Sequence, residues 1–147
     1  MSLGDGSNIS SYCDSDDQLT ANAIHNAVAK NISVVAATGN SGNSSGISYP
    51  ACISNVTAVG SVSKSGSISS FSNRWSLPML FAPGESITST YPGGFATASG
   101  TSMATPHISG AFALLHQYKK LEQNIILTPL QIQNASNYTG KQISDSS

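Results

Sequence analysis

Residues 98–115, ASGTSMATPHISGAFALL, decide the fold because they join a Gly-Thr turn to a long Ala-rich helix. Backbone N–H groups point outward at a helix N-terminus and favour negative charge there. A serine at that point exposes its hydroxyl group, and its own N–H can help to hold an oxyanion. The stretch predicts a nucleophilic Ser102 at the head of a helix over residues 102–120. We place Pro106 in the first turn, where its missing N–H costs no helix bond.

The rest of the chain alternates helical patterns with apolar strands, which is typical of an α/β domain with a mostly parallel sheet flanked by helices. Buried strands are predicted at 32–40, 55–62 and 77–84. Residues 85–99 are expected to be a loop with at most a short strand at 87–89. A helix is predicted at 16–32, where Asp16 and Asp17 suit the N-terminus as caps. Its apolar residues share one face: Leu19, Ala23, Ile24, Ala27 and Val28. Another helix is predicted after 127, with Thr128 as N-cap and Pro129 in the first position. Three strands are few for such a sheet, so we expect a partial domain.

Composition limits the function classes. The chain has 147 residues, a net charge of −1 and only 9% charged residues. Its six basic residues are scattered, so nothing electrostatic indicates nucleic acid or an anionic membrane as a partner. No apolar run approaches the roughly 20 residues of a membrane span.

The two cysteines and the N-x-S/T sequons bear on whether the protein enters the secretory pathway. Cys13 and Cys52 fit no zinc motif; they either form a disulfide that closes a loop of about 40 residues or are two free thiols. Six sequons favour a secretory or extracellular protein, although an Asn- and Ser-rich proteome explains them equally well. They lie at Asn8, Asn31, Asn43, Asn55, Asn134 and Asn137.

The serine stretch GTSMATPHISGAFALL resembles the nucleophile motif of the subtilisin-like serine proteases, the subtilases. Further segments resemble that family in the family's own order, over nearly the whole chain: MSLG, VVAATGNSG, SYPACISNVTAVGSV, SSFSN, LFAPGESITST and LTPLQIQNAS. The resemblance implies a subtilisin-like fold. It also implies that residues 1–147 are the C-terminal portion of the catalytic domain, without the N-terminal part that carries the Asp and His motifs.

The same resemblance assigns roles to individual residues. Ser102 matches the nucleophile, and Asn40 matches the side-chain donor to the oxyanion. Ser2, Leu3 and Gly4 match the strand that pairs with the bound peptide. The other matched substrate-binding residues are Ala36, Ala37, Thr38 and Gly39, in a wall of the P1 pocket, and Gly100 and Thr101, in the turn that presents the serine.

A nucleophilic serine needs a base and a group that orients the base, and the chain has neither of the family's motifs for them. Asp5 lies after the substrate segment, in the wrong place. His25 is expected on the surface of the first helix, and His116 near a helix end. His107 lies about 140° around the helix axis from the serine, and the resemblance implies a structural role for it beneath the site.

The resemblance therefore implies a serine endopeptidase that acts on peptides or proteins through an acyl-enzyme on Ser102, with this chain inactive alone. Three explanations of the missing Asp and His stay open: a truncated chain, a separate polypeptide or a degenerate paralogue. A pseudoprotease or peptide-binding module is the alternative function. Among partners we expect the missing N-terminal half or, in its absence, self-association through exposed edges. No cofactor and no metal are predicted, although a structural calcium is compatible with the full-length enzyme.

Overall fold

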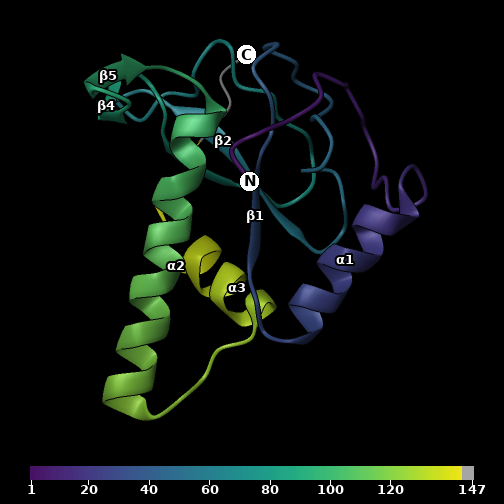
Figure 1. Cartoon of the computed structure of the whole chain (residues 1–147), viewed down its shortest axis with the longest axis vertical. Helices are drawn as coiled ribbons and strands as arrows, with labels where there is room; N and C mark the ends of the chain where they lie inside the picture. The colour runs from purple at the N-terminus through teal and green to yellow at the C-terminus, as the bar shows by residue number, and fades with distance from the viewer. Residues whose placement is uncertain (144–147) are drawn as a thin grey trace.

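The computed structural model describes residues 1–143 and contains a three-stranded parallel sheet with helices on both sides (Figure 1). The sheet order is β1-β2-β3, and β4 and β5 form a separate antiparallel hairpin. This arrangement confirms the predicted α/β class and its mostly parallel sheet. The elements are α1 (Gln18–Ala29), β1 (Val34–Ala37), β2 (Val56–Val62), β3 (Leu80–Pro83), β4 (Ile87–Tyr91), β5 (Gly94–Ala98), α2 (Thr101–Gln123) and α3 (Pro129–Thr139).

Side chains of the strands alternate between two apolar clusters, one on each face of the sheet. Ala36 of β1 packs with Ile24 of α1 on one face. Val35, the neighbour of Ala36, packs with Phe112 of α2 and Ile132 of α3 on the other face. Because both faces are covered, β2 is buried along its whole length, as expected for a central parallel strand.

Two helix starts follow the local rules that the sequence indicated. Asp17 is the N-cap of α1, and its carboxylate accepts hydrogen bonds from the N–H groups of Leu19 and Thr20. Thr128 is the N-cap of α3, with Pro129 in the first turn and a capping box completed by the Gln131 side chain. Side-chain oxygens therefore satisfy N–H groups that these helices leave free.

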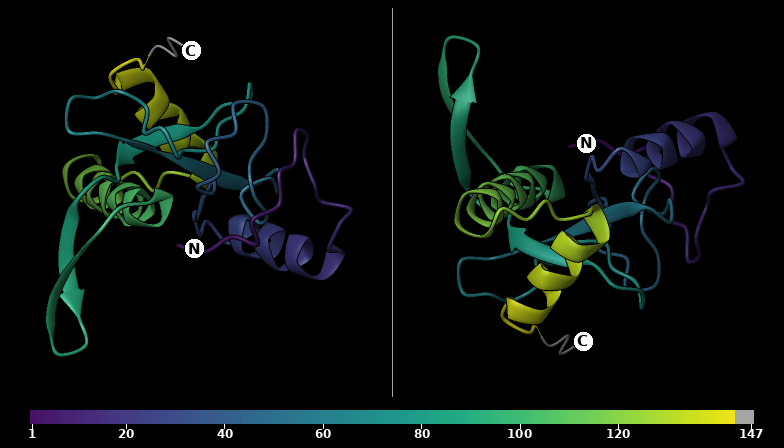
Figure 2. Two further views of the ribbon diagram at one scale, coloured as in Figure 1. Left: turned by 90° about the horizontal axis from the view of Figure 1, so that it is seen from above. Right: turned by 90° about the horizontal axis from the view of Figure 1, so that it is seen from below.

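The hairpin is the main departure from the predicted elements. Residues 85–99 were expected to be a loop with at most a short strand at 87–89. Instead, β4 and β5 pair from Ile87↔Ala98 to Tyr91↔Gly94 and project away from the body (Figure 2). The residues of both strands are exposed, apart from Ile87, which is partly buried. The hairpin therefore has no apolar alternation of the kind that identifies a half-buried strand in a sequence.

Two details of the helices were also predicted incorrectly. Helix α2 begins at Thr101, so Pro106 is in its second turn, and the C=O of Ser102 loses its partner four residues ahead. In α1, Ala21 and Ile24 are buried, whereas Leu19 is 84% exposed and Ala23 is also exposed. The helix contacts the sheet along a narrower stripe than its apolar residues suggest.

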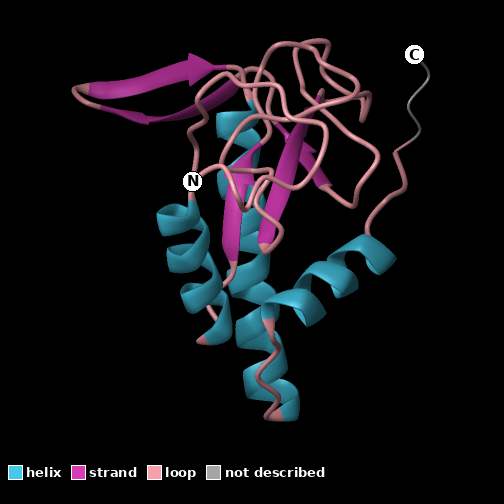
Figure 3. Cartoon of the chain, turned by 90° about the vertical axis from the view of Figure 1, so that its right-hand side faces the viewer, coloured by secondary structure: helices cyan, strands magenta, loops and turns pink. Residues whose placement is uncertain are grey.

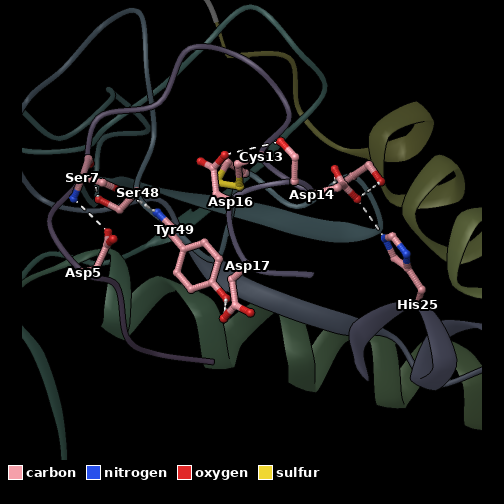
Figure 4. The surroundings of a disulfide bond; sticks show 12 residues. Asp5, Ser7, Cys13, Asp14, Asp16, Asp17, His25, Ser48 and Tyr49 are labelled. Carbon is pink, nitrogen blue, oxygen red and sulfur yellow. Dashed lines mark hydrogen bonds and ion pairs between the residues drawn. A yellow bond between two sulfur atoms is a disulfide. The ribbon is translucent and has the colours of Figure 1, made fainter. Parts of the chain in front are cut away.

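Cys13 and Cys52 form a disulfide, which decides between the two alternatives for these residues (Figure 4). Both residues are fully buried in the apolar cluster beneath α1. The bond joins the segment before α1 to the long connection between β1 and β2. It therefore crosslinks two irregular segments that have few other covalent or ladder constraints.

Candidate active site

The carboxyl ends of the parallel strands bring Asn40 and the start of α2 together. Strand β1 ends at Ala37, and the chain continues through Gly39 to Asn40 at the end of the sheet where irregular loops gather (Figure 3). The Gly39 N–H donates to Thr101 Oγ1 at 3.2 Å, and the Thr101 N–H donates to Asn40 Oδ1 at 2.9 Å. Ligand sites of open α/β sheets lie at this edge. Ser102, which follows Thr101, therefore lies next to Asn40, as the family resemblance implies.

The side chain of Asn40 is held in one orientation. Its Oδ1 accepts a second hydrogen bond, from Thr101 Oγ1 at 2.9 Å. Because both Thr101 groups donate to it, this atom must be the amide oxygen rather than the nitrogen. The Nδ2 group, with its two hydrogens, is then turned toward the Gly100 side, where a Cβ built on Gly100 would lie 3.4 Å from it. Asn40 is exposed, so this donor faces solvent.

The first turn of α2 leaves the N–H of Ser102 free. The Thr101 N–H bonds to Asn40, and the N–H groups of Met103 and Ala104 both reach the Gly100 C=O. Within the described part of the chain, neither the N–H nor the Oγ of Ser102 has a hydrogen-bond partner. Ser102 is partly exposed, so its hydroxyl and its N–H are both accessible beside the Asn40 amide.

Gly39 is required where the chain turns from β1 toward Asn40. Its φ is +98°, in the region that favours glycine. A Cβ at this position would collide with Ser48 Oγ and lie 2.6 Å from Asn73 Nδ2. Any larger residue would therefore displace the loop that carries Asn40.

The predicted substrate residues differ widely in exposure. Ser2, Leu3 and Gly4 are exposed and belong to no assigned strand, but Met1 extends the sheet beside β1. The Met1 amino group donates to the Val35 C=O, and the Ala37 N–H donates to the Met1 C=O at 3.1 Å. Residues 2–4 therefore leave the sheet edge just beyond β1, on the same side as Asn40.

The residues matched to the pocket wall are mostly covered. Ala36, Ala37 and Thr38 are at most 2% exposed, and Gly39 is partly exposed. In the turn before the serine, Gly100 and Thr101 are buried. Of these residues, Thr101 has the clearest function in the geometry, because it orients Asn40.

The structure brings none of the three histidines to Ser102. His107 is exposed rather than packed beneath the site, and its Nδ1 lies 2.9 Å from the Met103 C=O on its own helix. His116 lies further along α2. His25 is not fully solvated: its Nε2 lies 2.9 Å from Asp14 Oδ1, far from the serine in sequence and on the opposite face of the sheet. Among the described residues, therefore, no histidine is hydrogen-bonded to Ser102.

The partners of His25 form a network that the sequence analysis did not detect (Figure 4). Asp14 accepts hydrogen bonds from the Ser54 hydroxyl at 2.8 Å and from the Ser54 N–H at 3.2 Å. Burial acts to raise the pKa of Asp14, but the Ser54 hydrogen bonds and His25 outweigh it and lower the pKa. The carboxylate lies between the serine and the histidine, so it cannot orient the histidine as a base toward that serine. This network ties α1 to the disulfide region.

Residues 1–143 can also be considered for metal ligands and membrane-spanning helices. No three or more His, Cys, Asp or Glu side chains in that range are grouped so that they could hold a metal ion. No described helix has the length and apolar character needed to cross a membrane.

Comparison with known proteins gives consistent matches. The sequence profile described as "Subtilase family" matches residues 1–144. The chain is 45% identical over 104 residues to Subtilisin BL of Lederbergia lenta, which covers 70% of this chain and 38% of that protein. It is 40% identical over 121 residues to the Minor extracellular protease Epr of Bacillus subtilis (strain 168), which covers 82% of this chain and 19% of Epr.

A solved structure extends the match to the fold. The crystal structure of a cold adapted subtilisin-like serine proteinase superposes with a TM-score of 0.78 and 39% identity, over 99% of this chain and 50% of that one. The chain thus spans about half the length of that enzyme and less than half of the curated relatives above. The profile match over nearly all of its residues, together with this fold, shows that the chain belongs to the subtilase family.

Proposed function

We propose that this chain supplies the nucleophile and the oxyanion hole of a subtilisin-like serine endopeptidase. The observation that carries the proposal is the hydrogen bonding of Asn40. Thr101 occupies the Asn40 oxygen with two donors at 2.9 Å, so the amide N–H₂ is free to donate beside Ser102. A free amide and a free backbone N–H next to a serine hydroxyl form the donor pair that a tetrahedral oxyanion requires.

In the proposed reaction, Ser102 Oγ attacks the carbonyl carbon of a peptide bond. The carbonyl oxygen becomes an oxyanion and accepts hydrogen bonds from Asn40 Nδ2 and from the Ser102 N–H. The amine leaves with a proton, an acyl-enzyme remains on Ser102, and water hydrolyses it. These steps use side chains and backbone groups, so they need no cofactor.

The base that takes the Ser102 proton must come from outside the described residues. We assign it, with the Asp that orients it, to the N-terminal part of the family's catalytic domain, where the family pattern places the Asp and His motifs. The isolated chain is then inactive or nearly so, because donors without a base leave only a small part of the rate.

The surface that would receive this N-terminal half is open and apolar. Leu114, Tyr118 and Leu121 of α2 are 68%, 55% and 72% exposed, although they lie on a helix that packs against the sheet. Among the described residues, Met1 alone pairs with the sheet edge beside β1. Exposed apolar side chains and an open sheet edge each favour a partner, and the open edge favours one that continues the sheet.

A peptide substrate would pair with residues 2–4. This segment is exposed, and within the described chain its backbone has no hydrogen-bond partner. Unpaired extended backbone beside a sheet edge supports recognition by strand addition. We also place the protein in the secretory pathway or outside the cell, because buried disulfides persist in oxidising compartments.

The test uses the chain extended upstream by its own reading frame, reacted with a fluorophosphonate probe. The label is mapped by mass spectrometry. We expect it on Ser102, lost in Ser102→Ala and retained in Ser109→Ala, which removes another serine of the same helix. A well-folded extended protein that takes no label would refute the endopeptidase and favour a peptide-binding module.

A further inference from the structure

Besides Thr101, a second buried side chain holds the loop that carries Asn40: Asn73, from the connection between β2 and β3. Asn73 is 0% exposed. Its Oδ1 accepts the Ser41 N–H at 2.9 Å and the Asn43 N–H at 3.1 Å. A single amide oxygen therefore satisfies two backbone donors of the loop directly after Asn40.

The main chain of Asn73 holds the other side of the same loop. Its N–H donates to the Gly39 C=O at 3.0 Å, and its C=O accepts the Thr38 hydroxyl at 2.9 Å. The Gly39 C=O belongs to the peptide group that precedes Asn40, and the Ser41 N–H belongs to the peptide group that follows it. Both peptide groups that flank Asn40 are thus bonded to Asn73.

These bonds complement the contacts of the Asn40 side chain. Thr101 holds the Asn40 oxygen, whereas Asn73 holds the backbone from which that side chain projects. The direction of Asn40 Nδ2 depends on both anchors, because either one alone leaves the other end of the residue free to rotate.

We propose that Asn73 is a positioning residue that directs the Asn40 amide toward the oxyanion, acting through the two peptide groups around Asn40. This inference rests on the proposed function of Asn40 as the oxyanion donor. Asn73 itself is fully buried and does not touch the substrate.

The amide oxygen of Asn73 is the atom that matters. Its Nδ2 is buried and has no acceptor among residues 1–143. Asn73→Asp keeps the accepting oxygen, and burial favours the protonated carboxyl group, which is closest to the amide in charge. Asn73→Ala removes the oxygen and leaves two loop N–H groups without a partner. The two variants therefore separate hydrogen bonding from mere occupancy of the site.

The first measurement is kinetic and uses the chain extended upstream with a peptide substrate. We expect Asn40→Ala to lower kcat by about 10²–10³-fold, as for other oxyanion donors. Asn73→Ala should lower kcat by about 10–10²-fold with little change in KM, because a misplaced donor acts mainly on the transition state. Asn73→Asp should restore most of this loss.

The double variant Asn40→Ala/Asn73→Ala makes the test specific. If Asn73 acts through Asn40, Asn73→Ala causes no further loss of kcat once the Asn40 amide is gone. The matched control is Ser69→Ala, because Ser69 lies in the same connection as Asn73. The change removes its buried 2.8 Å bond to Ser61 of β2 and should leave kcat unchanged. Equal losses from Asn73→Ala in both backgrounds, or the same loss from Ser69→Ala, would overturn the inference.

The second measurement does not depend on catalysis. In the 147-residue chain, NMR of the Asn40 side-chain amide should give one sharp pair of signals, which broaden or shift in Asn73→Ala and not in Ser69→Ala. Unchanged Asn40 signals would refute the positioning role, whatever the activity. If the extended form hydrolyses no peptide but the Asn40 signals change in Asn73→Ala, the positioning role is supported and the proposed endopeptidase function is refuted.

Discussion

Thr101→Val tests the arrangement that orients Asn40, because valine has almost the shape of threonine but no hydroxyl group. In the native chain the Thr101 hydroxyl accepts from the Gly39 N–H at 3.2 Å and donates to Asn40 Oδ1 at 2.9 Å. Thr101 is 0% exposed, so little water can replace the lost group. The substitution removes both bonds and leaves the fold of the helix start otherwise intact.

The magnitude follows from what each partner retains. The partly buried Gly39 N–H loses its acceptor, and a donor left without a partner away from water costs about 1–3 kcal/mol. The Asn40 oxygen loses less, because the Thr101 N–H still reaches it at 2.9 Å. We expect the free energy of unfolding to fall by about 2 kcal/mol, which corresponds to a decrease in Tm of roughly 4–8 °C for a domain of this size.

The assay is urea unfolding of the 147-residue chain, at a concentration where sedimentation finds one species. Thr57→Val is the matched control, since Thr57 is also buried but donates only to the partly buried Gln133 side chain, at 3.1 Å. Gln133 can turn to solvent, so this control should cost about 1 kcal/mol or less. A cost for Thr101→Val no larger than that of Thr57→Val would refute the reasoning about the two-bond anchor.

Three further predictions concern stability and association. The disulfide joins residues 39 positions apart, and the double substitution Cys13→Ser/Cys52→Ser removes it. The free energy of unfolding in urea titrations should then fall by about 4 kcal/mol. A decrease of less than about 1 kcal/mol would contradict the stabilising role of the crosslink. The pKa values of Asp5, Asp14 and Asp17 are lowered in the folded chain. The three carboxylates therefore contribute to the free energy of unfolding above the unfolded-state pKa of about 3.9, and this contribution is lost as pH falls through the folded pKa values. If the unfolding curves do not change below about pH 4, this contribution is absent. The isolated chain should self-associate through its exposed α2 side chains and open sheet edge, and sedimentation of a single monomeric species at all concentrations would disprove this.

The parts of this molecule that sequence patterns predict are those encoded by neighbouring residues. The buried strands and the N-caps at Asp17 and Thr128 follow from apolar runs and from polar residues at helix starts. The proximity of Asn40 and Ser102 could be predicted only through the family resemblance, because 62 positions separate them and no local pattern relates the two.

Other features depend on contacts that no local pattern contains. The start of α2 at Thr101 is set by its hydrogen bond to Asn40, which moves Pro106 into the second turn. The β4–β5 hairpin is held by its own ladder without an apolar face, so it lacks the alternation that identifies a strand. Asn73 is one asparagine among eleven in the sequence, and only its burial and its partners distinguish it.

The proposed catalytic arrangement has two parts, the oxyanion donors and the base, and they differ in which residues position them. Every bond that orients Asn40 comes from this chain: Thr101 from the head of α2 and Asn73 from the connection before β3. The oxyanion hole therefore requires no contact with the base to be in place. Loss or replacement of the base would leave these donors oriented, and a peptide carbonyl could still accept hydrogen bonds from them. In the proposed site these donors accelerate the reaction only as far as they bind the oxyanion more strongly than the ground-state carbonyl, so their full effect on rate requires the base.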